Sequence, residues 1–172
     1  MITVNQAQKE NGVQINKISE KTMVFNKTEL GCVNELWEEY LSEGLGSEYN
    51  FLVAQEGNKI LGFICYGPHA LTEGAYDIYW IAVDPDYQNR GIGAALVKIV
   101  EEEVRNLNGS LLIAETSSTP PYRPACEFYN RNGFSREATV RDFYAIGDHL
   151  LIYTKHLNQK ASLHEDYLFQ EA

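Results

Sequence analysis

One segment organises the rest of the chain: Ile78-Tyr79-Trp80-Ile81-Ala82-Val83-Asp84-Pro85-Asp86-Tyr87-Gln88-Asn89-Arg90-Gly91-Ile92-Gly93-Ala94-Ala95-Leu96. Five of its first six residues are β-branched or aromatic, which predicts a buried strand. Asp84 precedes a proline and is therefore disfavoured in a helix, so a turn follows. Gly91 and Gly93 let the backbone approach a ligand closely, and the next helix presents unpaired N–H groups to it. The segment predicts a binding site for a phosphate-bearing ligand.

The loop within this segment resembles that of a known family. Gln88-Asn89-Arg90-Gly91-Ile92-Gly93 follows a strand that ends in Ala82-Val83 and precedes an amphipathic helix. It is similar to the acetyl-CoA pyrophosphate loop of the GNAT superfamily of N-acetyltransferases, whose pattern is Gln or Arg, two residues, Gly, one residue, and Gly or Ala. Glycine-rich turns before helices also occur as plain caps and in nucleotide-binding folds, so the rest of the chain has to decide.

A second motif, Ala125-x-x-Phe128-Tyr129-x-x-x-Gly133-Phe134, supports the resemblance. It is similar to the helix and following strand in which the family carries a Phe-Tyr pair and a Gly-Phe turn. A left-handed helix cap explains Gly133 without any ligand, but it does not explain Tyr129. Both motifs stand in the family's order, and the resemblance covers most of residues 25–155.

One position departs from the family pattern. Family members often carry Asn three residues before the Ala of the second motif, where its side chain can contact the cofactor. Here that position is Tyr122, inside Pro120-Pro121-Tyr122-Arg123-Pro124. The prolines stiffen this segment and start the helix later, so the cofactor contacts of this segment are expected to differ.

Length and charge restrict the partners. The 172 residues suffice for one self-sufficient domain. The net charge of -10 argues against a nucleic-acid partner, which needs a basic surface, and suits cationic small molecules or lysine-bearing surfaces better. An acidic surface that only aids solubility is the alternative. The first twenty residues are polar and no apolar run is of membrane-spanning length, so neither a secretory signal nor a membrane partner is expected.

The cysteines and histidines indicate neither disulfides nor a metal site. Cys32, Cys65 and Cys126 form no CxxC pair, and the histidines at 69, 149, 156 and 164 are scattered. We therefore expect no metal and a cytoplasmic location. Cys126 reads as a buried helix thiol rather than a nucleophile, because no histidine lies in its segment.

The elements were assigned from periodicity and turn signals. Residues 1–12 are expected to be flexible, 13–155 to form the acetyltransferase domain, and 156–172 to be a loose tail or a homodimer contact. A short strand is expected over 13–18. Asn26 and Glu29 predict a capping box at the start of a helix. The remaining expectations are a hairpin of 49–55 with 59–66, a helix over 92–106, a strand over 110–115, then a helix, a strand and a final hairpin across Gly147-Asp148.

This order predicts an α/β fold of the α+β type, in which helices flank a single mixed, partly parallel sheet. In its central strand, simple alternation puts Asp77, Tyr79, Ile81 and Val83 on one face. It puts Tyr76, Ile78, Trp80 and Ala82 on the other.

The resemblance implies an acetyl-CoA-dependent N-acetyltransferase that transfers acetyl directly to a primary amine of a small molecule or a lysine side chain. Acetyl-CoA would be a co-substrate. Its pantetheine arm would pair with the backbone of the strand end, formed by Ile81, Ala82 and Val83. Its pyrophosphate would lie on the backbone of Gln88, Asn89, Arg90, Gly91, Ile92, Gly93 and Ala94.

The resemblance also implies catalytic roles. Tyr129, with an ordinary pKa of about 10 against about 8.5 for a thiol, is the candidate acid for the departing sulfur. Its alternative is a buried phenol that donates only to a backbone carbonyl. Asp77 and Glu115 are the candidate bases, against the alternatives of salt-bridged strand-end carboxylates or ordered water as the base.

The loops Glu115-Thr116-Ser117-Ser118 and Asp142-Phe143-Tyr144 through Asp148 are candidate acceptor contacts. Two other functions stay open. One is a non-catalytic acyl-CoA-binding sensor module; the presence of Tyr129 favours an enzyme over this alternative. The other is transfer of a larger acyl group, because the loop contacts only the coenzyme part.

Overall fold

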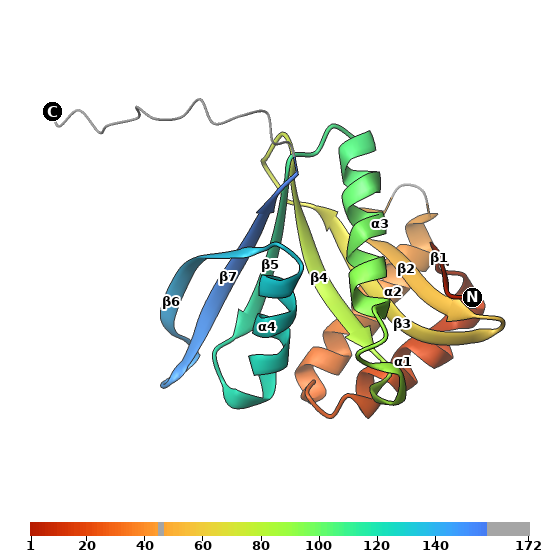
Figure 1. Ribbon diagram of the computed structural model, residues 1–172, viewed down its shortest axis with the longest axis horizontal. Helices are drawn as coiled ribbons and strands as arrows, with labels where there is room; N and C mark the ends of the chain where they lie inside the picture. Colours follow the sequence, from red (N-terminus) through yellow and green to blue (C-terminus); the bar gives the residue numbers. More distant parts are fainter. Residues whose placement is uncertain (45–46, 158–172) are drawn as a thin grey trace, which may run out of the picture.

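The computed structural model describes residues 1–44 and 47–157. Within them seven strands form one sheet in the order β1-β2-β3-β4-β5-β7-β6 (Figure 1). Neighbouring strands are antiparallel apart from β4 and β5, which run parallel. The strands are β1 (Thr3–Gln6), β2 (Asn50–Glu56), β3 (Lys59–Pro68), β4 (Ala75–Val83), β5 (Leu111–Ser117), β6 (Ser135–Ala145) and β7 (Asp148–His156). The mixed α/β architecture predicted from the sequence is confirmed.

The helices occupy both faces of this sheet. The α-helices are α1 (Gly12–Lys21), α2 (Lys27–Glu43), α3 (Ile92–Asn106) and α4 (Arg123–Arg131), and the short 3-10 turns are η1 (Lys9–Asn11), η3 (Pro85–Tyr87) and η4 (Pro120–Tyr122). Helices α3 and α4 pack on one face and α1 and α2 on the other. None of the helices in the described ranges is long and apolar enough to cross a membrane.

The N-terminal expectations were wrong. The supposedly flexible residues 1–12 contain β1, which pairs with β2 from Thr3 opposite Gln55 to Gln6 opposite Leu52. Most β1 side chains are exposed, so no apolar alternation announces the strand. The strand expected over 13–18 is part of α1, because Ile15 and Ile18, three residues apart, are the side chains that the helix buries.

Several other elements lie where they were expected. Asn26 caps α2 in a capping box with Glu29, and α3 spans 92–106. The hairpin of β2 and β3 and the final β6–β7 hairpin also form. Of the expected tail, His156 ends β7 and Leu157 is buried in the core, whereas 158–172 and the dimer contact expected there lie outside the described residues.

The central strand does not alternate simply. Cys65 of β3 is opposite Trp80, but the next residue, Tyr66, is opposite Ile78, so Tyr79 is an extra residue that forms a β-bulge. The bulge shifts the alternation. Tyr79, Trp80 and Ala82 therefore pack toward α1 and α2, and Tyr76, Ile78, Ile81 and Val83 pack toward α3 and α4. Relative to Ile78 and Tyr79, the sequence-based assignment of all four residues from Trp80 to Val83 to faces was wrong.

Candidate functional site

The candidate site is the space that opens where β4 and β5 separate. The two strands pair from Ala75 opposite Leu111 to Ile78 opposite Ala114, and beyond these residues they are not paired. They splay apart in Figure 1, with α4 and α3 on either side of the split. A pocket of about 340 Å³ fills the split. Its lining residues are Phe25, Asn26, Glu29, Tyr79, Trp80, Ile81, Glu115, Thr116, Ser117, Tyr122, Ala125, Tyr129, Tyr144 and Asp148.

The edge of β4 presents backbone groups to this split. The Asp84 N–H donates to the Leu61 carbonyl of the neighbouring chain segment. In an antiparallel pair alternate residues direct both backbone groups the same way, so Ala82 faces β3, whereas Ile81 and Val83 face the split. The Val83 carbonyl already accepts from Gln88 Nε2 at 3.3 Å. Ile81 is thus the residue of this edge whose backbone groups are open to a ligand.

The N-terminus of α3 has backbone N–H groups that could bind an anion. Gly91, at the N-cap position, has φ of 77° in the left-handed region, and no side chain caps the helix. The first bond into the helix runs from the Ala95 N–H to the Gly91 carbonyl at 2.9 Å. The N–H groups of Ile92, Gly93 and Ala94 precede this bond and are therefore available to an anion. The loop in front of them is exposed.

Gly91 and Gly93 of the loop are glycines for different structural reasons. Gly91 requires glycine because of its positive φ, and a Cβ there would meet open space. At Gly93 a Cβ would lie 2.8 Å from the Phe128 ring, so this residue is small because α4 packs against α3. Packing therefore explains Gly93 without a ligand. Phe128 in turn contacts the neighbouring Tyr129 ring, with centroids 5.5 Å apart, so α4 is fixed relative to the loop.

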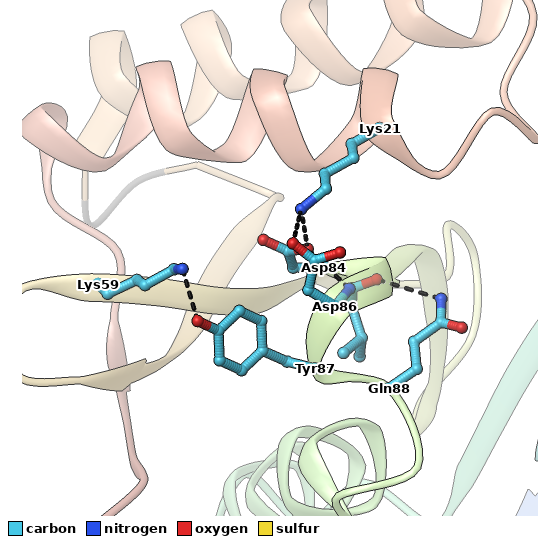
Figure 2. A network of polar contacts seen from close by, with 7 residues as sticks. Lys21, Lys59, Asp84, Asp86, Tyr87 and Gln88 are labelled. Carbon is cyan, nitrogen blue, oxygen red and sulfur yellow. Dashed lines mark hydrogen bonds and ion pairs between the residues drawn. The ribbon is translucent and has the colours of Figure 1, made fainter.

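A polar network fastens the turn ahead of the loop, as Figure 2 shows. Lys21 Nζ, at the end of α1, lies 2.6 Å from Asp84 Oδ1 and 2.6 Å from Asp86 Oδ2. Lys59 Nζ donates to the Tyr87 hydroxyl at 2.7 Å. Burial raises the pKa of Asp84, but the hydrogen bonds from Lys21 and the Asp86 N–H, together with the positive charges of Lys21 and Lys59, outweigh burial and lower the pKa. Helix α1 and strand β3 thus hold η3 in place.

Arg90, predicted as a coenzyme contact, lies beside this network. Its guanidinium carbon is 5.3 Å from the centre of the Tyr87 ring. Asn89 has a positive φ of 60°, as the sharp turn into Gly91 requires. Both side chains are exposed at the mouth of the helix N-terminus.

Tyr129, predicted as the acid, is a buried residue at the pocket. The side chain is 5 % exposed and lines the pocket. Burial, followed by the nearby Cys126, raises the pKa of its hydroxyl well above the ordinary value, and no hydrogen bond contributes to that shift. Among the described residues the hydroxyl has no partner, which argues against the alternative of a phenol bound to a backbone carbonyl. It remains protonated and free to donate into the pocket.

The two candidate bases lie in different surroundings. Glu115 lines the pocket, whereas Asp77 is not among the lining residues and its Oδ2 lies 2.7 Å from His69 Nδ1. Partial burial, then the negative charge of Asp77, raises the pKa of Glu115, and His69 opposes the shift. Asp77 and Glu115 are on one face of the sheet, because Asp77 is opposite Ile113, two residues before Glu115. The histidine contact of Asp77 was not foreseen.

Side chains from α2, η4, β5, β6 and β7 close the far wall of the pocket. The Tyr122 hydroxyl donates to Glu29 Oε1 at 2.5 Å and so joins η4 to the start of α2. Ser117 Oγ donates to Asp148 Oδ1 at 2.5 Å and joins β5 to β7. Tyr144 of β6 completes this wall. Tyr122, at the position where the family often has Asn, therefore forms part of the pocket wall.

The sequence missed the contribution of α2. Phe25, Asn26 and Glu29 line the pocket, although Asn26 and Glu29 had been explained fully as a capping box. A capping signal locates a helix start in the sequence but does not say which cavity that start faces. Of the acceptor loops proposed from the sequence, Thr116, Ser117, Tyr144 and Asp148 line the pocket, whereas Ser118, Asp142 and Phe143 are not among its lining residues.

Comparisons with known proteins agree with this geometry. A family model described as the acetyltransferase (GNAT) domain matches residues 47–136. The [ribosomal protein bS18]-alanine N-acetyltransferase of Escherichia coli K12 is 30% identical over 115 residues, which are 64% of this chain and 72% of that protein.

Solved structures share the fold. A crystal structure from Desulfovibrio desulfuricans, assigned to the GNAT acetyltransferases, is 38% identical with a TM-score of 0.88 and covers 92% of this chain and 100% of its own. An aminoglycoside 6'-N-acetyltransferase complexed with coenzyme A has a TM-score of 0.70 at 15% identity, covering 93% of this chain and 99% of its own. At that identity the likeness concerns the fold alone.

Proposed function

The chain belongs to the GNAT acetyltransferase family, and from that premise we propose that it transfers the acetyl group of acetyl-CoA directly to a primary amine. The acceptor amine belongs to a small molecule or a lysine side chain. The observation that carries the proposal is the pocket in the split. The β4 edge at Ile81, the Glu115 carboxylate and Tyr129, whose hydroxyl has no partner among the described residues, all line it.

The residues present fit acetyl-CoA. The uncapped α3 N-terminus offers the N–H groups of Ile92, Gly93 and Ala94 to a pyrophosphate. The Ile81 backbone can pair with the pantetheine arm, as strand edges pair with extended chains. Ala82 is not proposed for that pairing, because its backbone faces β3. The Gln88 side chain, bound to the Val83 carbonyl, holds the loop against the strand end instead of reaching for the coenzyme.

The chemistry needs an activated acyl group and two proton movements. Acetyl-CoA supplies a thioester whose carbonyl carbon accepts the amine nitrogen and whose C–S bond then breaks to release a thiolate. Glu115 takes the proton that the amine loses as the C–N bond forms. The Ile81 N–H donates to the carbonyl oxygen as that oxygen gains negative charge. Tyr129 donates a proton to the sulfur, and solvent returns the proton from Glu115 to Tyr129.

Glu115 is the better base of the two candidates. A base must reach the amine directly or through one water, and Glu115 lines the pocket, whereas Asp77 is held by His69. The raised pKa of Glu115 also strengthens it as a proton acceptor. Its active form is the carboxylate, so the rate should rise with pH through that raised pKa.

The high pKa of Tyr129 does not oppose its role. Burial disfavours the phenolate, and burial would disfavour in the same direction a thiolate released beside it. The match between the ordinary values of phenol and thiol, about 10 and about 8.5, is therefore preserved within the site. Because the hydroxyl stays protonated, no limb of the pH–rate profile near neutrality should arise from Tyr129.

A thiol-release assay with acetyl-CoA and a panel of amines tests the proposal. Tyr129→Phe should lower kcat about a hundredfold and change acetyl-CoA affinity little. Tyr153→Phe is the matched control, because that buried ring lies 5.5 Å from Tyr129 and is not among the pocket residues. Binding of acetyl-CoA without thiol release from any amine would favour the non-catalytic sensor instead.

We extend the proposal to a cytoplasmic location. Cys32, Cys65 and Cys126 are all free thiols, as a reducing compartment would leave them. Alkylation of the protein as isolated from cells, followed by mass spectrometry, should find all three cysteines modified after denaturation. A disulfide or a cleaved leader would contradict the location.

A further inference from the structure

The acceptor side of the pocket is strongly acidic. Glu29, Glu115 and Asp148 line it together, and its described lining includes no lysine, arginine or histidine. None of the three carboxylates belongs to an ion pair within the described residues. Their hydrogen-bond donors are neutral: the Asn26 N–H and Tyr122 hydroxyl at Glu29, and the Ser117 hydroxyl at Asp148. The pocket therefore keeps uncompensated negative charge.

This negative charge contributes to raised pKa values of two neighbouring tyrosine hydroxyls. Burial, then the charges of Glu115, Asp148 and Glu29, raise the pKa of Tyr144. Burial and the hydrogen bond to Glu29 raise the pKa of Tyr122, with a further contribution from Asp148. Contributions from α2, β5 and β7 thus converge on the same few side chains. A cation placed among them would interact with more than one carboxylate.

Aromatic rings share this wall with the carboxylates. Phe25, Trp80, Tyr122 and Tyr144 line the pocket, and Phe25 and Trp80 meet edge to face at 5.1 Å. Ring faces attract ammonium groups, most of all where water is excluded. The combination of carboxylates and rings suits an alkylammonium chain, whose methylene groups lie on the rings and whose charged end meets a carboxylate.

A single reacting amine does not account for this arrangement. Proton removal needs one carboxylate, Glu115. Glu29 and Asp148 accept hydrogen bonds from neutral donors, but neither has a cationic partner among the described residues. The Tyr129 hydroxyl, on a side chain 5 % exposed and without a partner among the described residues, lines the same pocket and independently marks it as a ligand site. A pocket of about 340 Å³ is at the small end of ligand sites, which suits a slender chain rather than a protein surface.

Resting on the proposed function, we propose that the acceptor is a small di- or polyamine, with a second ammonium group held beside Asp148 and the Tyr144 ring. The amine at the other end of the acceptor, away from Asp148, is the one that loses its proton to Glu115 and reacts. A carboxylate on the acceptor would be repelled, so free amino acids and acidic peptides are poor acceptors.

The test compares butylamine with putrescine, which have the same carbon chain and differ by the second amine, and adds spermidine and a lysine peptide. Thiol release from acetyl-CoA should give a kcat/KM at least about tenfold higher for putrescine than for butylamine. Asp148→Asn keeps an oxygen for the Ser117 hydroxyl but removes the charge. It should raise the KM for putrescine about tenfold and shrink the preference over butylamine.

Two further variants make the test specific. Tyr144→Leu removes the aromatic ring of a side chain that is 49% exposed, so the variant should still fold. This variant should also raise the KM for putrescine. Asp142→Asn removes a charge from the same hairpin but is not among the pocket residues, so the preference should stay as in the intact enzyme. Calorimetric titration of the protein with putrescine, with butylamine as reference, gives a readout independent of turnover.

The outcomes separate the two proposals. Equal kcat/KM for butylamine and putrescine, or a lysine peptide preferred to both, would overturn the diamine inference and leave the acetyl transfer standing. An Asp148→Asn enzyme with undiminished preference would do the same. Failure of all amines to release thiol would overturn the proposed function itself.

Discussion

The proposed coenzyme side and the proposed acceptor side of the split are built in different ways. The proposed coenzyme side is backbone from one continuous segment, in which Ile81 lies near the end of β4 and Gly91 is the N-cap of α3. The acceptor side is assembled from side chains of α2, β5, η4, β6 and β7. A continuous backbone site can be recognised in a sequence, whereas an assembled side-chain site depends on the fold. The predictions below test that division.

The largest effect should come from the backbone side. Gly91→Val places a β-branched residue at φ of 77° and obstructs the loop, so acetyl-CoA affinity should fall more than about a hundredfold. Gly57→Val is the matched control, because Gly57 also has a positive φ of 59° with open space around it but lies in the β2–β3 turn. Calorimetry with acetyl-CoA and thermal unfolding should show similar destabilisation in both variants and lost binding in the first alone.

On the side-chain side, Glu115→Gln should lower kcat/KM about a hundredfold and remove the acidic limb of the pH–rate profile. That limb lies above the usual range for a glutamate, since burial and Asp77 raise the pKa of Glu115. Asp77→Asn should keep the limb but shift it to lower pH, because the negative charge that raises this pKa is lost. The pH–rate profiles of the intact enzyme, Glu115→Gln and Asp77→Asn identify the base. An unchanged acidic limb in Glu115→Gln would assign the role of base to Asp77 or to water.

A smaller effect should reach the coenzyme side through Lys21. Lys21→Met removes the ion pairs to Asp84 and Asp86 that hold η3, so acetyl-CoA affinity should fall about fivefold. Lys17→Met, on the same helix, is the control, because its exposed side chain is in none of the described ion pairs. Lys21→Arg should restore most of the affinity. Equal affinity in Lys21→Met and Lys17→Met would show that the loop needs no support from α1.

The same ion pair makes a prediction about pH. The pKa of Asp84 is lowered in the folded state, so its contribution to stability is present above its ordinary value and is lost as pH falls through the folded-state value. The pKa of Lys21 is raised, so its contribution is lost only at alkaline pH. Thermal unfolding should therefore find Lys21→Met less stable than the intact protein at neutral pH, with the difference vanishing in acid. A difference that persists at low pH would assign it to packing.

The division also explains what the sequence could predict. Local signals located the capping box at Asn26, the helix over 92–106 and the left-handed glycine at 133, which has φ of 81°. These features depend on neighbouring residues alone. The bulge at Tyr79 could not be predicted, because it arises from the register of β4 against β3. It reassigned Trp80 and Ile81 to opposite faces from those that alternation gave.

Long-range pairing accounts for the remaining misses. The strand at Thr3–Gln6 exists because an edge of β2 accepts it, and its own side chains give no pattern. Likewise Glu29 was explained as a helix cap, and its second oxygen turned out to receive the Tyr122 hydroxyl from a segment 93 residues away. Tyr129 was singled out from the sequence, but only the fold shows that it lines the pocket.

We propose above all that the segment from Ile81, which lines the pocket, to Ala94 binds the coenzyme. Calorimetric titration of the purified protein with acetyl-CoA and with free coenzyme A tests it most directly. We predict saturable binding of both at one site per chain, which Gly91→Val abolishes and Gly57→Val preserves. Absence of binding by the intact, folded protein would contradict the claim.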